Sequence, residues 1–132
     1  MAIPLQSLSG TEVLRRGTVN SQSSTYTSLK FDGQIAPTTT GQSGNVVPAN
    51  HIITMLNIFF CELGNASQQL HMSIEGAHAS GIYLLRYQSI GAYQTFVWAD
   101  KFSLIGGDQV RVQTQASANV DVWYNYIDQS WV

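Results

Sequence analysis

The stretch from Leu104 to Ile127 constrains the fold of this chain more than any other. Apolar and polar residues alternate in two short runs joined by a small polar turn, and Gly106, Gly107 and Asp108 interrupt the chain just before the first run. Alternation with a period of two predicts half-buried β-strands, and we interpret the two runs as a β-hairpin. Because a single hairpin is not stable in water, the preceding sequence must supply further strands that cover its apolar face.

That preceding sequence carries strand signals separated by turn signals about every ten residues, the spacing of an all-β sandwich or barrel. The strands expected, in chain order, lie within 18–31, 51–63, 68–75, 82–87, 93–98 and 101–105. The segment 51–63 is rich in β-branched and aromatic residues, which favours a long, well-buried strand over a buried helix. In the first segment, the residues expected to face inward are Val19, Tyr26, Leu29 and Phe31.

The first sixteen residues show no clean period, and Pro4 and Gly10 interrupt their scattered apolar residues. We interpret residues 1–16 as an N-terminal extended arm and residues 17–132 as one β domain, since 132 residues fit a single domain. Apolar arm residues that cannot be buried locally suggest docking on the domain or on a neighbouring subunit. The polar loop 36–45 is the second expected contact segment.

Charge and hydropathy exclude two classes of partner. Charged residues make up 11% of the chain and the formal net charge is −2, with no basic stripe that could neutralise phosphates, so we expect no nucleic-acid partner. No stretch approaches the roughly 20 apolar residues of a membrane span, so we expect no membrane partner. The first residues lack the basic and apolar segments of a secretory signal, and we expect folding in a cytosol.

The histidines and the cysteine do not indicate a metal or a nucleophile. His51, His71 and His78 have no metal-ligand spacing, and we interpret them as surface or loop residues, with His71 on the polar face of its strand. Cys61 lies in the apolar run Ile-Phe-Phe-Cys and is interpreted as a small buried hydrophobe rather than a reactive thiol.

The acidic residues also lack a catalytic pattern, and we interpret them as isolated acids in turns or on outward faces: Glu62, Glu75, Asp100, Asp108, Asp121 and Asp128. Asp108 follows two glycines and is expected to bond nearby backbone N–H groups as a turn former. Glycine-rich phosphate loops are absent from the sequence. We therefore predict no catalytic, cofactor-binding or metal-ligating residue, and no enzyme activity.

The last strand places one large aromatic residue away from the core. Alternation puts Val120, Val122, Tyr124 and Tyr126 on one face, which leaves Trp123 on the other. An exposed Trp there suits subunit packing or stacking on a sugar, and core filling at a sheet edge stays equally open.

The segment from Val47 to Ile127 resembles the small jelly-roll modules of tailed bacteriophage virions, which occur in head decoration (cement) proteins, head fibres and tail accessory proteins. The resemblance is carried by the early Val-Pro-Ala-Asn turn and by the late Gly-Gly-Asp corner with the alternating residues that follow it. These residues are Val47, Pro48, Ala49 and Asn50, then Leu104, Gly106, Gly107, Asp108, Val110, Val112, Ala116, Ala118, Val120 and Val122.

This resemblance implies an all-β, jelly-roll type β-sandwich that follows the N-terminal arm. It implies a structural virion protein, a capsid decoration protein that forms a homotrimer, binds the major capsid protein on the outer surface of a phage head and is made in the host cytoplasm. The alternative is a carbohydrate- or receptor-binding module of a phage tail or fibre. A cupin-type enzyme would need a cluster of His and carboxylate ligands that the sequence does not display.

Overall fold

The computed structural model describes residues 10–22, 26–31, 46–76, 81–114 and 119–131. Within these ranges the chain is all-β, and no helix there is long and apolar enough to cross a membrane. The strands are β1 (Gly10–Gln22), β2 (Thr27–Ser28), β3 (His51–Glu62), β4 (Gln68–Glu75), β5 (Ile82–Ile90), β6 (Thr95–Trp98), β7 (Phe102–Ile105), β8 (Gln109–Thr114) and β9 (Val120–Trp131).

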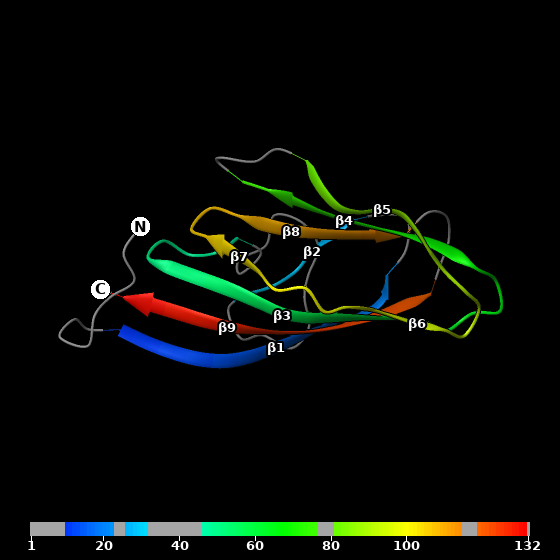
Figure 1. Ribbon diagram of the computed structural model, residues 1–132, viewed down its shortest axis with the longest axis horizontal. Helices are drawn as coiled ribbons and strands as arrows, with labels where there is room; N and C mark the ends of the chain where they lie inside the picture. Colours follow the sequence, from blue (N-terminus) through cyan, green and yellow to red (C-terminus); the bar gives the residue numbers. More distant parts are fainter. Residues whose placement is uncertain (1–9, 23–25, 32–45, 77–80, 115–118, 132) are drawn as a thin grey trace.

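The strands form two antiparallel sheets that pack face to face as a sandwich (Figure 1). One sheet has the order β1-β9-β3, with β6 and β7 both pairing with β3, and the other has the order β2-β8-β4-β5. The first strand thus pairs with the last, β2 with β8, β3 with β6 and β7, and β4 with β5. Nested antiparallel pairs distributed over two sheets are the topology of a jelly roll, so the predicted fold class is confirmed.

The core lies between the two sheets and is filled by alternate residues of the long strands. On β9 the predicted inward face is confirmed, because all four of its residues are buried. The largest fully buried apolar side chains come from both sheets and from the segment after β2: Leu29, Phe31, Ile53, Met55, Ile58, Phe60, Leu70, Met72, Leu104, Tyr124 and Tyr126.

Strands β8 and β9 do not form the predicted hairpin. β8 pairs with β2 and β4, whereas β9 pairs with β1 and β3. The alternating pattern specifies which face of each strand is buried, but it does not specify which strand lies beside it. The two strands therefore lie in opposite sheets and bury their apolar faces in the same core.

The Gly-Gly-Asp segment is the corner that takes the chain from β7 in one sheet to β8 in the other. Gly107 has a φ of +93°, a left-handed conformation that favours glycine. The Asp108 carboxylate accepts a hydrogen bond from the backbone N–H of Ile105 at 2.9 Å, and the Asp108 N–H donates to the Ile105 carbonyl at 3.0 Å. The predicted turn-forming role of Asp108 is confirmed.

The N-terminal segment differs from the expected irregular arm. Residues 10–16 belong to β1, which pairs with β9 in continuous register from Gly10 opposite Trp131 to Val19 opposite Val122. The sequence hides this strand because β1 is an edge strand whose residues 11–14 are all exposed, so no buried alternation marks it. Residues 1–9 of the predicted arm and the predicted loop 36–45 lie outside the described residues.

Two smaller expectations are also wrong. Tyr26 lies on the surface instead of facing inward, because it precedes β2 on the outer side of its sheet. The strand expected within 82–87 continues to Ile90, which is buried and ends β5. Val19, Leu29 and Phe31 are buried as predicted.

The side chain of Tyr124 links the two sheets. Its hydroxyl accepts a hydrogen bond from the Lys30 backbone N–H at 2.9 Å and donates one to the Lys30 carbonyl at 2.9 Å. Lys30 follows β2, so β9 of one sheet is joined to the edge of the other. Gly17 stands opposite Tyr124 in the register, and a Cβ at Gly17 would overlap the Tyr124 ring. The bare backbone of Gly17 therefore makes room for the link.

We expect Tyr124→Phe to lower the free energy of unfolding by about 1–3 kcal/mol, because it leaves two buried backbone groups of Lys30 without their partner. Urea denaturation followed by circular dichroism measures the change. Tyr93→Phe, which removes a hydroxyl from an exposed ring, is the control. Equal stability of the two variants would contradict the role assigned to the Tyr124 hydroxyl.

Candidate functional site

A row of exposed side chains crosses the outer face of the five-stranded sheet. Thr18 on β1 stands opposite Trp123 on β9, Trp123 stands opposite Phe59 on β3, and Phe59 stands opposite Val97 on β6. We call these four residues the Trp123 row. The exposed fractions of Trp123, Phe59 and Val97 are 40%, 39% and 47%, so three apolar side chains in register face solvent. The prediction that Trp123 lies on the face opposite the core is confirmed.

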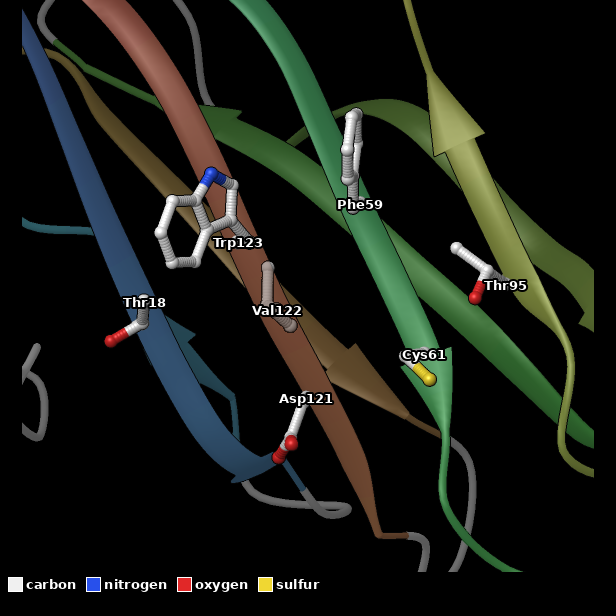
Figure 2. Close-up of a pocket in the computed structure, with 7 residues that line it drawn as sticks. All are labelled: Thr18, Phe59, Cys61, Thr95, Asp121, Val122 and Trp123. Carbon is white, nitrogen blue, oxygen red and sulfur yellow. The ribbon is translucent and has the colours of Figure 1, made fainter.

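A hollow of about 590 Å³ lies beside this row. Its other lining residues include Asp121, Cys61 and Thr95, which form the adjacent row on three of these strands, β9, β3 and β6 (Figure 2). The large rings of Trp123 and Phe59 stand beside the small side chains of Cys61 and Thr95, and this difference in height makes the hollow. The surface is concave and mostly apolar, on a sheet that no other element covers within the described residues.

The indole ring of Trp123 already carries a partner. The guanidinium carbon of Arg16, two residues before Thr18 on β1, lies 5.3 Å from the centroid of the Trp123 ring. Such a cation–π contact holds the ring in place and occupies space above it. One row further along, the Asn125 side chain donates a hydrogen bond to the Asn57 side chain at 2.7 Å. The apolar row is therefore bounded by ordered polar groups.

The described residues that line the hollow beside the Trp123 row do not form a catalytic arrangement. Cys61 faces this outer surface and is half-buried, so its predicted burial in the core is wrong. The reason is the period of β3, since the neighbouring Phe60 and Glu62 take the inward positions. The thiol stands opposite Asp121 in the register, and no imidazole that could act as its base lines the hollow among the described residues.

The outer face of the four-stranded sheet is chemically different. It carries a hollow of about 240 Å³ lined by polar, charged and aromatic side chains. We call this site the tyrosine hollow; its residues are Tyr26, His71, Ser73, Glu75, Tyr83, Arg111 and Gln113.

The register explains how the tyrosine hollow forms. Ser73 on β4 stands opposite Arg111 on β8 at one side and opposite Tyr83 on β5 at the other. A small side chain between two large ones leaves a depression over the sheet. The Arg111 guanidinium lies 4.7 Å from the centroid of the Tyr26 ring, and its Nη1 lies 3.7 Å from an oxygen of Glu75.

Irregular pairing between β4 and β5 gathers large side chains at the rim of the tyrosine hollow. The register shifts twice, between Leu70 and Met72 and between Met72 and Ser73. Tyr87 has a φ of +55°, a conformation that costs energy for a non-glycine residue. As a result the guanidinium of Arg86 lies 4.6 Å from the Tyr83 ring and 5.5 Å from the Tyr87 ring. Bulges of this kind redirect side chains next to functional sites.

His71 lies on the polar face of β4, as predicted, and packs against tyrosine rings. Its ring centroid is 4.7 Å from that of Tyr87 and 6.4 Å from that of Tyr83. Partial burial, and to a smaller extent the positive charge of Arg86, lowers the pKa of His71 below its ordinary value of 6.5. The imidazole is therefore neutral at pH 7 and adds no charge to the tyrosine hollow.

Two of the acids predicted to face outward are buried instead. Asp128 is buried at the end of the core, where its carboxylate lies 2.7 Å from Nδ1 of His51 and 3.4 Å from Nε of Arg15. Glu62 is also buried and accepts a hydrogen bond from the Gly64 N–H at 2.8 Å. The expectation of outward-facing acids is wrong for these two, because both occupy inward positions of their strands.

The described residues contain no cluster of three or more His, Cys, Asp or Glu side chains that could hold a metal ion. His51 and His71 lie in different sheets, and His78 lies outside the described residues. The site-residue prediction, which names no metal ligand, stays a prediction.

Of the residues that form the Trp123 row and the tyrosine hollow, the sequence analysis identified Trp123 as an exposed contact residue but did not predict either surface. Phe59 sits in a continuous apolar run, where an outward residue is not distinguished from its inward neighbours Ile58 and Phe60. Tyr26, Tyr83 and Arg111 are 28 to 85 positions apart and come together only through strand pairing. The local signal for the tyrosine hollow was the polar face of β4, on which the sequence analysis placed His71.

No protein-family model and no curated protein matches the chain. Among solved structures, the chain is similar to a disulfide-linked pilus of Bacillus endospore appendages, at 9% identity and a TM-score of 0.46, over 100% of this chain and 98% of that one. It is similar to the capsid of a Helicobacter pylori bacteriophage, at 9% identity and a TM-score of 0.44, over 91% and 92% of the two chains. It is also similar to the virus-like particle of an extra small virus of the prawn Macrobrachium rosenbergii, at 10% identity and a TM-score of 0.46, over 98% and 84%.

We expect the pKa of His71 to lie below 6.5. We expect Arg86→Gln to raise this pKa only part of the way towards 6.5, because burial is the larger cause of the shift. Protonation of His71 then costs stability as the pH falls below about 6.5, since the unfolded chain binds that proton more readily. An NMR titration of the imidazole resonances measures both values. A pKa at or above 6.5 in the unaltered protein would contradict the burial.

Proposed function

We propose that this protein is a structural virion protein, a capsid decoration protein that binds the outer surface of a phage head and bridges major capsid subunits. The observation that carries the proposal is the Trp123 row, an apolar surface at the centre of a broad, rigid sheet. An exposed apolar patch rimmed by polar groups is typical of a protein–protein contact. Interfaces are enriched in Trp and Phe, and a central Trp is a common hot spot.

The occupant that we assign to the Trp123 row is a second copy of this chain, within a homotrimer. Arg16 and Asp121 carry opposite charges on the same face, on either side of the row. A surface with both signs beside an apolar centre suits head-to-tail packing between identical subunits, in which the positive side of one copy meets the negative side of the next. The predicted N-terminal arm and the loop 36–45 then remain for contact with the major capsid protein.

The jelly-roll topology and the resemblance of residues 47–127 to virion modules support the same function. The alternative, stacking of a sugar on Trp123, is less favoured by the geometry. The lining of the adjacent hollow is mostly apolar, whereas saccharides also need several hydrogen-bonding groups.

We expect the purified protein to be a trimer and expect Trp123→Gln to shift it towards monomer by at least about tenfold in dissociation constant, the effect of losing about 1.4 kcal/mol. Size-exclusion chromatography with light scattering over a range of concentrations measures the change. Tyr93→Asn is the control, because it removes an exposed ring outside the row, 70% exposed against 40% for Trp123, at a position whose φ of +57° asparagine tolerates. A monodisperse monomer at every concentration would overturn the trimer.

Attachment to the capsid needs a separate measurement. We expect the protein to co-sediment with phage heads that lack it, in a stoichiometry of one trimer per binding site, and expect Trp123→Gln to weaken this attachment because monomers lose the avidity of the trimer. Heads that retain the protein no better than an unrelated protein of similar charge would contradict the decoration function while leaving the trimer intact.

A further inference from the structure

The Trp123 row lies on one outer face of the sandwich, and the tyrosine hollow lies on the other. The tyrosine hollow plays no part in the proposed trimer, and its chemistry is that of a ligand site. We propose that the tyrosine hollow binds a saccharide unit that carries a carboxylate, with Arg111 as the anion-binding residue and Tyr83 and Tyr26 as aromatic walls.

The size of the tyrosine hollow limits the ligand to one ring-sized unit. Its volume of about 240 Å³ is below that of sites for drug-sized molecules, which begin at roughly 300 Å³. The floor is formed by strands of a rigid sheet, with Ser73 at its centre. A site built on paired strands is already formed before the ligand arrives, which lowers the entropy cost of binding.

The aromatic residues at the rim supply apolar surface for the faces of a sugar ring. Tyr83 and Tyr26 line the tyrosine hollow with exposed fractions of 47% and 42%. Each ring is held by a guanidinium, since Arg86 lies over Tyr83 and Arg111 lies over Tyr26. Their rotamers are therefore fixed by these contacts, as in binding sites that use tyrosine for rigid amphipathic walls.

The polar residues supply the hydrogen bonds that a sugar ring requires. The hydroxyl of Ser73, the amide of Gln113 and the carboxylate of Glu75 all line the tyrosine hollow. Together they offer donors and acceptors at the level of the floor, whereas the rings form the sides. Apolar walls and a polar floor fit a sugar ring, because the two faces of the ring are apolar and its edge carries hydroxyl groups.

The charge of the site favours an acidic ligand. Arg111 lines the tyrosine hollow and Arg86 lies over the ring of Tyr83 beside it, so two cations stand near one carboxylate, Glu75, on a protein whose formal net charge is −2. The Arg111 side chain is 25% exposed, and the contact of its Nη1 with Glu75 is long, at 3.7 Å, so the guanidinium can reach a ligand in the tyrosine hollow. A planar guanidinium binds a carboxylate with charge-assisted, directional hydrogen bonds.

The test uses the full chain and two matched probes, the methyl glycosides of glucuronic acid and of glucose. These probes differ only in the carboxylate, so their comparison isolates the role of Arg111. We expect saturable NMR amide shifts at Ser73, Tyr83 and Arg111 with the glucuronide, and affinity weaker by about tenfold or more for the glucoside, the loss of one charge-assisted interaction.

Three variants complete the experiment. We expect Arg111→Met, which keeps most of the apolar stem, to weaken glucuronide binding by about tenfold or more, and Tyr83→Ala to weaken it by a similar factor through loss of a wall. Lys101→Met removes an exposed cation between β6 and β7, two strands of the opposite sheet, and should leave binding unchanged. Circular dichroism checks that each variant is folded, and Tyr83→Ala keeps the test decisive if Arg111→Met unfolds, because Tyr83 is exposed on the edge strand β5.

Four outcomes would overturn the proposal: no saturable shifts with the glucuronide, equal affinity for the two glycosides, glucuronide binding untouched by both Arg111→Met and Tyr83→Ala, or the same shifts produced by sodium acetate at equal concentration. The last outcome would mean that Arg111 binds simple anions only. Each of these results is independent of the trimer and of capsid attachment, since neither measurement involves the tyrosine hollow.

Discussion

The pairing of β9 with β1 on one side and β3 on the other fixes the arrangement of the five-stranded sheet. Because the side chains of a strand alternate, the register that buries Val122 and Tyr124 also turns Trp123 outward, and a shift by one residue would exchange the two sets. The hydroxyl of Tyr124 then joins this sheet to Lys30 beside the other one. The core and the exposed Trp123 row are thus two consequences of a single register.

The two outer faces of the sandwich differ in the chemistry that they present. On the five-stranded sheet, large apolar residues stand in register with one another across three strands. On the four-stranded sheet, serine and histidine of β4 are flanked by arginine and tyrosine from the neighbouring strands. The first surface suits a broad protein partner, which excludes water from apolar groups, and the second suits a small polar ligand. A β-sandwich can bind a protein partner on one face and a small ligand on the other at the same time, because the core separates the two faces.

Irregularities in the strands contribute to both faces. The bulge in β3 between Met55 and Asn57 keeps Ile58 and Phe60 inward while Phe59 stays outward beside Trp123. The register shifts between β4 and β5 bring Tyr83, Arg86 and Tyr87 to the rim of the tyrosine hollow. Neither effect follows from a strict period of two, so sequence patterns miss the residues that these shifts redirect.

The sequence alone determined the all-β class, most strand positions, the turn at Asp108 and the outward position of Trp123, because each depends on local alternation or local turn chemistry. It did not determine that β8 and β9 lie in opposite sheets or that β1 begins at Gly10. It also did not determine that Asp128 faces inward and Cys61 outward, the reverse of what was expected for each. It also did not determine which residues meet at the tyrosine hollow. Those features depend on which strands become neighbours, and a period of two specifies the face of a side chain but not the strand beside it. Only the tertiary structure makes that choice, since it is made by packing over the whole core.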